Sequence, residues 1–137
     1  MKKTASAVWN GGLKDGTGSF SVGSGAIKDQ KYGFKSRFED GPGSNPEELI
    51  AAAHASCFSM AFSAQLGERG ITPQSVKTDA AITFENLTLT KSVLTTVVTA
   101  PGADINTIEE AAAAAKAGCP ISKVLKLDIE LNLTVNN

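Results

Sequence analysis

The two cysteines of the chain, Cys57 and Cys119, are the side chains best suited to chemistry. With no third or fourth cysteine, they form neither a disulfide framework of the kind found in small secreted domains nor a metal cluster. In a reducing cytosol, where disulfides rarely persist, such a pair is either inert or redox-active. The residues around each sulfur therefore decide what the pair can do.

Cys57 lies among Ala, Ser and Phe residues in a predicted helix, and a cysteine in that setting is more often a small buried residue than a reactive one. Cys119 differs, because Gly118 precedes it and Pro120, where a short helix could begin, follows it. Unpaired amides at a helix start lower the pKa of a thiol. Local electrostatics alone would make Cys119 the more reactive thiol, and a turn cysteine without a role is the alternative.

Three further side chains could assist a thiol. His54 precedes Cys57 by three positions on the same helical face, so it could activate the thiol, although a histidine of the core or of a pocket wall is the commoner case. Arg37, predicted on a strand between two phenylalanines, is either solvated or turned inward to stabilise a thiolate and bind a carboxylate through two hydrogen bonds. The charge of Glu47 is explained by the helix that begins beside it.

Local signals also predict the elements that position these residues. Residues 4–38 alternate β-formers with glycine turns, so short strands are expected there. A breaker cluster at 41–44 follows, and Asn45 and Pro46 then start a helix that ends at about Gly67.

The second half of the chain contains further strand and helix signals. Strands are expected at 75–84 and 87–99, because both segments are rich in Val, Ile and Thr. A helix at 105–116 capped by Asp104, a short helical turn at 121–125 and an alternating strand at 126–135 complete the chain. The order predicts a single α+β domain over residues 1–137, with antiparallel pairing and no repeats.

The first predicted helix is apolar or small on nearly every face, so it needs cover all round. One sheet and one further helix cover only one side, and a homodimer in which two copies of the helix pack together is the economical solution. Its segment 49–66 has about the length of a membrane span, but it contains His54, Gln65 and three serines. A buried helix of a soluble protein is therefore expected, with no membrane partner.

The charge balance and the first residues of the chain argue against a nucleic-acid-binding, lipid-binding or secreted protein. The 13 Lys and Arg residues nearly balance the 14 Asp and Glu residues and are scattered, so binding to nucleic acid or anionic lipid is not expected. The basic start is not followed by an apolar stretch, so no secretory signal is predicted and a cytoplasmic location is expected.

Several segments together resemble the OsmC/Ohr family of osmotically inducible and organic hydroperoxide resistance proteins. The matching stretches run from Tyr32 to Glu39, from Asn45 to Met60 and from Lys116 to Ser122. They include the sequences Asn-Pro-Glu-Glu-Leu and Ala-Gly-Cys-Pro, which are specific individually and occur here in the family's order. The resemblance extends over nearly the whole chain.

The resemblance implies a fold and a reaction. The implied fold has antiparallel sheets wrapped around two central helices in an intertwined homodimer. Cys57 would attack an organic hydroperoxide and become a sulfenic acid, and Cys119 would resolve it as a disulfide, which protects the sulfur from further oxidation. An external dithiol, in this family often a lipoyl group, would restore the thiols without any metal, haem or flavin.

The family also implies that Arg37 holds Cys57 as a thiolate and that Glu47 positions Arg37. The organic hydroperoxide resistance branch takes its arginine from a Gly-Gly-Arg-Asp-Gly turn, whereas residues 11–16 are Gly-Gly-Leu-Lys-Asp-Gly, which favours the OsmC branch. Ten residues of straight helix place Glu47 about 15 Å from Cys57. Either the helix bends or the two residues meet across subunits, and we expect the site at the dimer interface.

Apolar side chains near these positions could line a peroxide pocket that favours alkyl or lipid hydroperoxides over hydrogen peroxide. At least two of the rings are expected to contact the site, and the alternative is that most of them are core. The candidate pocket residues are Phe34, Phe38, His54, Phe58 and Met60, with Phe62 as further apolar bulk.

Two other functions use the same residues. A thiol redox sensor or disulfide exchanger would need both cysteines but would not turn over peroxide, and the absence of a Cys-x-x-Cys sequence counts against it. A binding module would bury both thiols, and the family resemblance counts against that.

Overall fold

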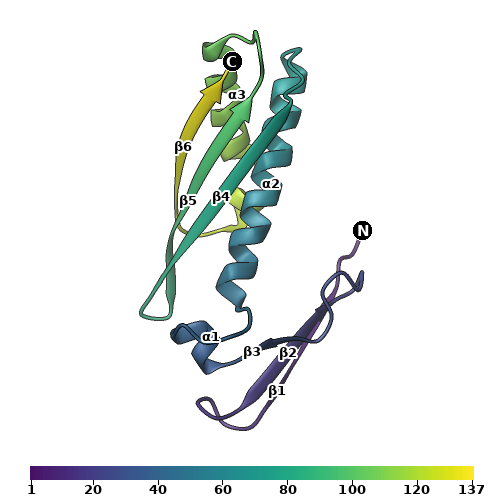
Figure 1. Cartoon of the computed structure of the whole chain (residues 1–137), viewed down its shortest axis with the longest axis vertical. Helices are drawn as coiled ribbons and strands as arrows, with labels where there is room; N and C mark the ends of the chain where they lie inside the picture. Colours follow the sequence, from purple (N-terminus) through teal and green to yellow (C-terminus); the bar gives the residue numbers. More distant parts are fainter. The chain divides into compact units, whose positions relative to one another are not determined.

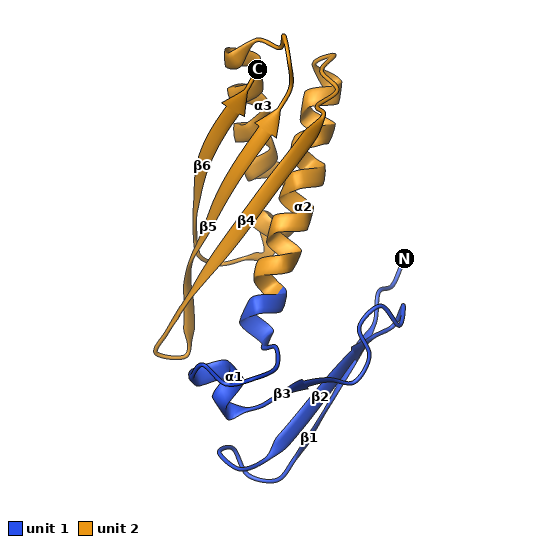
Figure 2. Cartoon of the chain, in the orientation of Figure 1, with its two compact units in different colours: residues 1–49 blue, residues 50–137 orange.

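The chain folds into two three-stranded sheets, two long helices and two short ones, described for residues 1–137 by a computed structural model (Figure 1). Its contacts cluster in two compact units, residues 1–49 and 50–137 (Figure 2). Each unit contains one of the sheets. The mixture of helices and sheets is the α+β class that the order of elements predicts.

In the first unit, strands β1 (Ala5–Asn10), β2 (Thr17–Val22) and β3 (Gln30–Tyr32) form an antiparallel sheet in that order. Gly18 pairs with both Trp9 and Tyr32, whose rings lie 5.6 Å apart between centroids. A Cβ atom on Gly18 would come within 2.6 Å of both rings. Glycine at this position therefore allows the two aromatic rings to pack across the sheet.

The prediction of strand through residue 38 is wrong at its end, because Phe34–Phe38 forms the short helix α1. The Ser36 hydroxyl accepts a hydrogen bond from the Gly33 N–H at 2.9 Å and donates one to the Gly33 carbonyl at 3.0 Å, which closes the first turn. The Asn45 side chain donates to the Ser36 carbonyl at 2.9 Å. These local bonds outweigh the β-propensity of the two phenylalanines.

Helix α2 (Pro46–Glu68) starts where the sequence predicts. The Asn45 side chain accepts a hydrogen bond from the Glu48 N–H at 2.7 Å, so it is the expected cap. Gly70, at φ 76°, follows the end of the helix in the left-handed conformation typical of helix termination. The predicted end at about Gly67 is correct to within a residue.

In the second unit, β4 (Ser75–Glu85) and β5 (Thr88–Thr99) form an antiparallel hairpin. Helix α3 (Ile105–Gly118) is capped by Asp104, which accepts from the Thr107 N–H at 2.9 Å, and α4 (Pro120–Val124) follows it. Strand β6 (Asp128–Asn136) then pairs with β5 in parallel, which corrects the expectation of antiparallel pairing throughout. The two helices act as a crossover that returns the chain to the same end of the sheet.

The core of this unit lies between the sheet and the two long helices (Figure 1). Helix α2 contributes a stripe of fully buried side chains spaced four residues apart, His54, Phe58, Phe62 and Leu66. Strand β5 contributes Leu94 and Val98, and α3 contributes Ile108 and three alanines.

The other faces of α2 are less covered, and Met60 is 77% exposed. By length and composition alone the helix could cross a membrane, a test that the core helix of a soluble protein also passes. Cover by a second copy of the chain remains a prediction.

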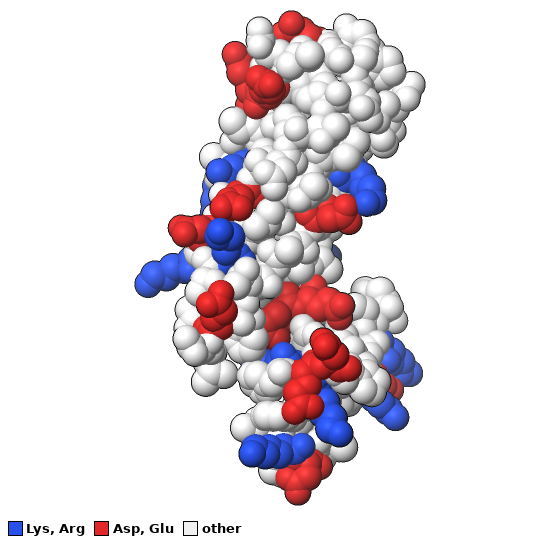
Figure 3. All heavy atoms as spheres, turned by 60° about the vertical axis from the view of Figure 1, so that its left-hand side comes forward, with Lys and Arg blue, Asp and Glu red and all other residues white.

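Charged side chains of both signs are mixed on the face shown in Figure 3. Within the second unit, Lys77 pairs with Asp79 at 2.8 Å and Lys91 with Glu130 at 3.1 Å. Because each of these lysines lies beside a carboxylate, the two pairs add little net charge to the surface.

Candidate functional site

The two cysteines, remote in sequence, are neighbours in the second unit. The Sγ atoms of Cys57, on α2, and Cys119, at the junction of α3 and α4, lie 2.7 Å apart. Both are unbonded thiols. A disulfide bond is about 2.05 Å long, so the two sulfurs can be joined by a small movement.

Two helices meet at Cys119. Its N–H donates to the Ala115 carbonyl at 2.9 Å, which closes the last turn of α3, and its carbonyl accepts from the Lys123 N–H at 3.1 Å, which starts α4. Pro120 occupies the first position of α4, where its missing N–H costs nothing. The backbone on both sides of Cys119 is therefore fixed, and with it the position of its sulfur.

The pKa values of the two thiols shift in opposite directions. Burial raises the pKa of Cys57, and its hydrogen bond with Cys119 raises it further. Burial also acts to raise the pKa of Cys119, but hydrogen bonds with Cys57, with the N–H and hydroxyl of Ser122 and with the N–H of Ile121 outweigh burial and lower it. Within this unit Cys119 is the more acidic thiol, in the direction that local electrostatics predicts.

Access to solvent favours the other thiol. Cys119 is 0% exposed, whereas Cys57 is only partly buried. A reagent from solution therefore reaches Cys57 first, whatever the order of the two pKa values. Cys119 is thus the more acidic thiol and Cys57 the more accessible one.

His54 does not use its ring nitrogens on Cys57. The imidazole is 0% exposed, and its Nδ1 lies 2.7 Å from the Ser92 hydroxyl and its Nε2 2.9 Å from the Ser122 hydroxyl. Burial lowers the pKa of His54. The ring is therefore neutral at pH 7, donating through one nitrogen and accepting through the other.

The two serines were not among the residues predicted from the sequence. Ser92 faces the core from β5 and shares that face with Leu94, Thr96 and Val98, so its only signal was an inward-facing hydroxyl in a largely apolar strand. Ser122 lies in the short helix α4, and nothing in the sequence relates it to His54, 68 positions away.

In the first unit, Arg37 and Glu47 form an ion pair. The guanidinium donates from Nε at 3.0 Å and from Nη2 at 2.9 Å to the same oxygen, Glu47 Oε1. Arg37 projects from helix α1 rather than from the predicted strand, and its guanidinium lies 5.3 Å from the centre of the Phe38 ring. Glu47 Oε2 is buried without a hydrogen-bond partner, so this carboxylate can accept a further donor.

An apolar cavity of about 220 Å³ adjoins this ion pair. Arg37 lines it together with two of the predicted pocket residues, Phe34 and Phe38, whose rings lie 4.9 Å apart. Trp9, Leu13 and Tyr32 complete its wall. Trp9 and Leu13 come from β1 and the β1–β2 turn, which are distant in sequence from the arginine, so no local pattern indicated these two residues.

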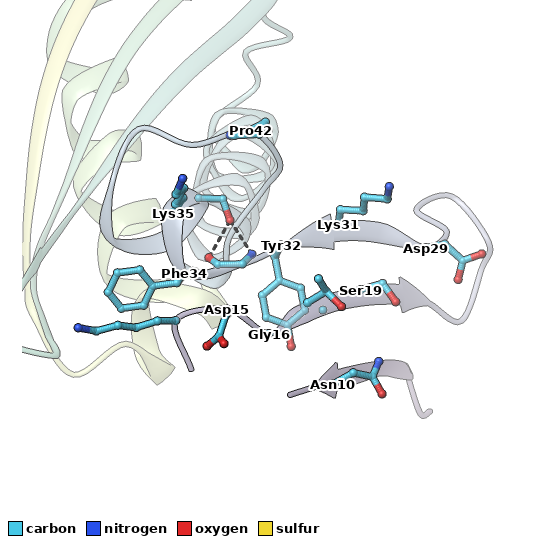
Figure 4. Close-up of a pocket in the computed structure, with 15 residues that line it drawn as sticks. Asn10, Asp15, Gly16, Ser19, Asp29, Lys31, Tyr32, Phe34, Lys35 and Pro42 are labelled. Atoms are coloured by element: carbon cyan, nitrogen blue, oxygen red, sulfur yellow. Dashed lines mark hydrogen bonds between the residues drawn. The ribbon is translucent and has the colours of Figure 1, made fainter. Parts of the chain in front are cut away.

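A larger and more polar cavity, of about 630 Å³, lies in the same unit (Figure 4). Tyr32 and Phe34 line both cavities, and the hydrogen bonds of Ser36 with Gly33 hold the α1 end of the larger one. All residues that line either cavity belong to residues 1–49.

The other predicted pocket residues belong to the second unit. His54 and Phe58 are 0% exposed, so in this chain they are core, and Met60 is an exposed residue of α2. The structure therefore assembles the candidate residues in two groups, Arg37 and Glu47 with the aromatic cavity, and Cys57 with Cys119. No group of three or more His, Cys, Asp or Glu side chains is placed to hold a metal ion.

Comparison with known proteins gives the family. The family model described as OsmC-like protein matches residues 39–134. The chain is 47% identical over 136 residues to peroxiredoxin OsmC of Escherichia coli K12, an alignment that covers 96% of this chain and 95% of that protein. Peroxiredoxin OsmC of Shigella flexneri matches to the same extent.

Solved structures share the fold. An OsmC-like protein of unknown function from Vibrio cholerae has a TM-score of 0.78 at 16% identity, over 98% of this chain and 99% of that one. An OsmC-like protein from Mycoplasma pneumoniae has a TM-score of 0.77 at 16% identity, over 100% and 99%. The organic hydroperoxide resistance protein OhrB of Bacillus subtilis has a TM-score of 0.66 at 26% identity, over 96% and 98%. The family model and the 47% identity to the two peroxiredoxins show that the chain belongs to the OsmC branch of the OsmC/Ohr family.

Proposed function

We propose that this protein is a thiol-dependent peroxidase that reduces organic hydroperoxides, as part of the defence against oxidative or osmotic stress. The observation that carries the proposal is the 2.7 Å separation of the Cys57 and Cys119 sulfurs. Relatives named as peroxiredoxins and as an organic hydroperoxide resistance protein support it.

The proposed cycle has three steps. The Cys57 thiolate attacks the terminal peroxide oxygen, the O–O bond breaks, and the alkoxide leaves and takes up a proton as the alcohol, with Cys57 as a sulfenic acid. The Cys119 thiolate then attacks the Cys57 sulfur, a disulfide forms, and hydroxide leaves as water. An external dithiol, such as a lipoyl group on a partner protein, reduces the disulfide by exchange. The cycle requires no prosthetic group.

Cys57 is assigned as the attacking thiol because of access. A peroxide cannot reach a sulfur without exposed surface, and Cys119 has none. The lower pKa of Cys119 suits the second step, in which a thiolate attacks the sulfenic acid. The assignment requires a cation to stabilise the Cys57 thiolate in the working protein.

Arg37 is the proposed source of that cation, and Glu47 is proposed to position it. Two hydrogen bonds to Glu47 hold the guanidinium, which keeps its positive charge at any pH at which the thiol reacts. We propose a homodimer with the active sites at the subunit interface, so that Arg37 acts from its own chain or from the partner subunit. The apolar cavity beside Arg37 would bind the carbon chain of an alkyl or lipid hydroperoxide.

Steady-state peroxide consumption tests the proposal. The reduced protein is mixed with cumene hydroperoxide and dihydrolipoamide, and loss of peroxide is followed for the wild type and for the Cys57→Ser and Cys119→Ser variants. Cys57→Ser should be inactive, and Cys119→Ser should stop after one oxidation unless an external thiol intervenes.

Other outcomes select other functions. If Cys57→Ser retains turnover and Cys119→Ser does not, the two roles are reversed and acidity outweighs access. If the wild type forms the disulfide but does not turn over peroxide, the protein is a redox sensor or disulfide exchanger. A cytoplasmic location is proposed with the cycle, since the thiols must be kept reduced.

A further inference from the structure

A buried chain of hydrogen bonds leads to the Cys119 sulfur. It links Ser92 on β5, His54 on α2 and Ser122 on α4 at 2.7 Å and 2.9 Å. Ser92 and His54 are 0% exposed and Ser122 is 9% exposed. The peroxidase cycle described above uses none of these three residues.

These hydrogen bonds approach the Cys119 sulfur through helix α4. Ser122 is the third residue of this helix and Cys119 its cap, so the two residues lie within one helical turn of each other. The hydroxyl of Ser122 also interacts with the Cys119 sulfur. Ser122 therefore bonds to the imidazole and, one helical turn from Cys119, helps to lower the pKa of the thiol.

The state of His54 determines what the Ser122 hydroxyl can do. If His54 donates from Nε2, Ser122 accepts with its oxygen and its own proton can point at Cys119. Nδ1 then accepts from the Ser92 hydroxyl, a role that a serine hydroxyl can fill. In the opposite form Ser122 would donate to His54 and would have no proton left for the sulfur.

We propose that His54 and Ser122 are positioning residues for the resolving thiol: His54, held by Ser92, orients the Ser122 hydroxyl as a donor to the Cys119 sulfur, which is thereby held as a thiolate ready to attack Cys57. The inference deepens the proposed function and rests on its assignment of Cys119 as the second thiol to react. It predicts that these hydrogen bonds control the formation of the disulfide bond and not the first reaction at Cys57.

A disulfide reagent separates the two steps without any peroxide. With 5,5′-dithiobis(2-nitrobenzoate), the Cys57 thiolate displaces one thionitrobenzoate and forms a mixed disulfide. The Cys119 thiolate then attacks the Cys57 sulfur and releases the second thionitrobenzoate as the protein disulfide forms. Stopped-flow absorbance measures both releases in the full-length protein.

Ser122→Ala should slow the second release on the order of tenfold, because a hydrogen bond to a charged sulfur is lost. His54→Leu should do the same, and His54→Gln should restore part of the rate, because its amide can donate to Ser122 and accept from Ser92. Ser59→Ala is the matched control. Ser59 lies on the same helix and its hydroxyl donates to Thr78 Oγ1 at 2.8 Å, but it is not linked to either cysteine.

The inference is overturned if Ser122→Ala and His54→Leu both release the second thionitrobenzoate at the wild-type rate, or if Ser59→Ala slows it equally. Circular dichroism identifies a variant that has not folded, and Ser122→Ala, the smaller change, then decides. The proposed function fails separately, if the wild type forms its disulfide with this reagent but does not consume cumene hydroperoxide.

Discussion

The pH dependence of stability tests the neutral, buried state of His54. It is the only histidine of the chain, it has no exposed surface, and both ring nitrogens are hydrogen-bonded to serines. Burial lowers its pKa in the folded protein. In the unfolded chain the imidazole returns to the ordinary value of about 6.5.

The direction in which the free energy of unfolding changes with pH follows from proton binding. Below about pH 6.5 and above the folded pKa, the unfolded chain binds a proton that the folded chain does not, so the free energy of unfolding decreases as the pH falls. If the folded ring took up no proton at all, the decrease from pH 7.5 to pH 5 would be about 2 kcal/mol, which is the upper limit. Most carboxylates titrate below this range and lysines above it.

Urea unfolding measures the effect at several pH values between 5 and 7.5. The wild type should lose up to about 2 kcal/mol over this range, and His54→Gln, which cannot titrate, should show a flatter profile whatever its absolute stability. Proton NMR gives a second measurement, since the only histidine has a single Cε1–H signal to follow. The reasoning is refuted if that signal titrates at or above pH 6.5, or if both proteins lose stability equally.

Three further substitutions test other parts of the structure. Asn45→Ala should cost about 1–2 kcal/mol in urea unfolding, because Asn45 caps α2 and also bonds to Ser36, and Asn45→Asp should recover the cap. Arg37→Lys cannot keep both bonds to Glu47 and should slow peroxide consumption on the order of tenfold, since bonds to charged groups contribute about 1.5–3 kcal/mol before screening, and Arg37 is 38% exposed. Phe62→Ala should destabilise the core by about 3–5 kcal/mol, as measured by urea unfolding.

Long elements with clear signals were predictable from the sequence. Helix α2 begins at its cap and proline, and β4 and β5 follow runs of Val, Ile and Thr. Helix α1 was not predictable, because a single Ser36 hydroxyl decides its first turn. The parallel pairing of β6 was also missed, since it depends on the path of the crossover and not on any property of the strand.

The candidate site also contains residues that the sequence indicated and residues that it did not. The cysteines were identified by residue type and by family resemblance, and no pattern in the sequence requires the contact of their sulfurs that the structure shows. The serines that hold His54 lie on β5 and α4, 38 and 68 positions from it. Hydrogen bonds between residues so far apart have no periodicity, so only the folded structure reveals them.

One residue, Cys119, closes the last turn of α3 and opens the first turn of α4, and its sulfur touches α2. A covalent bond at that sulfur would therefore fasten three helices at one point. Oxidation would suppress local opening of this corner, and the amide protons of Lys123 and Leu125, which bond back to Cys119 and Ile121, would exchange with solvent more slowly in the oxidised protein.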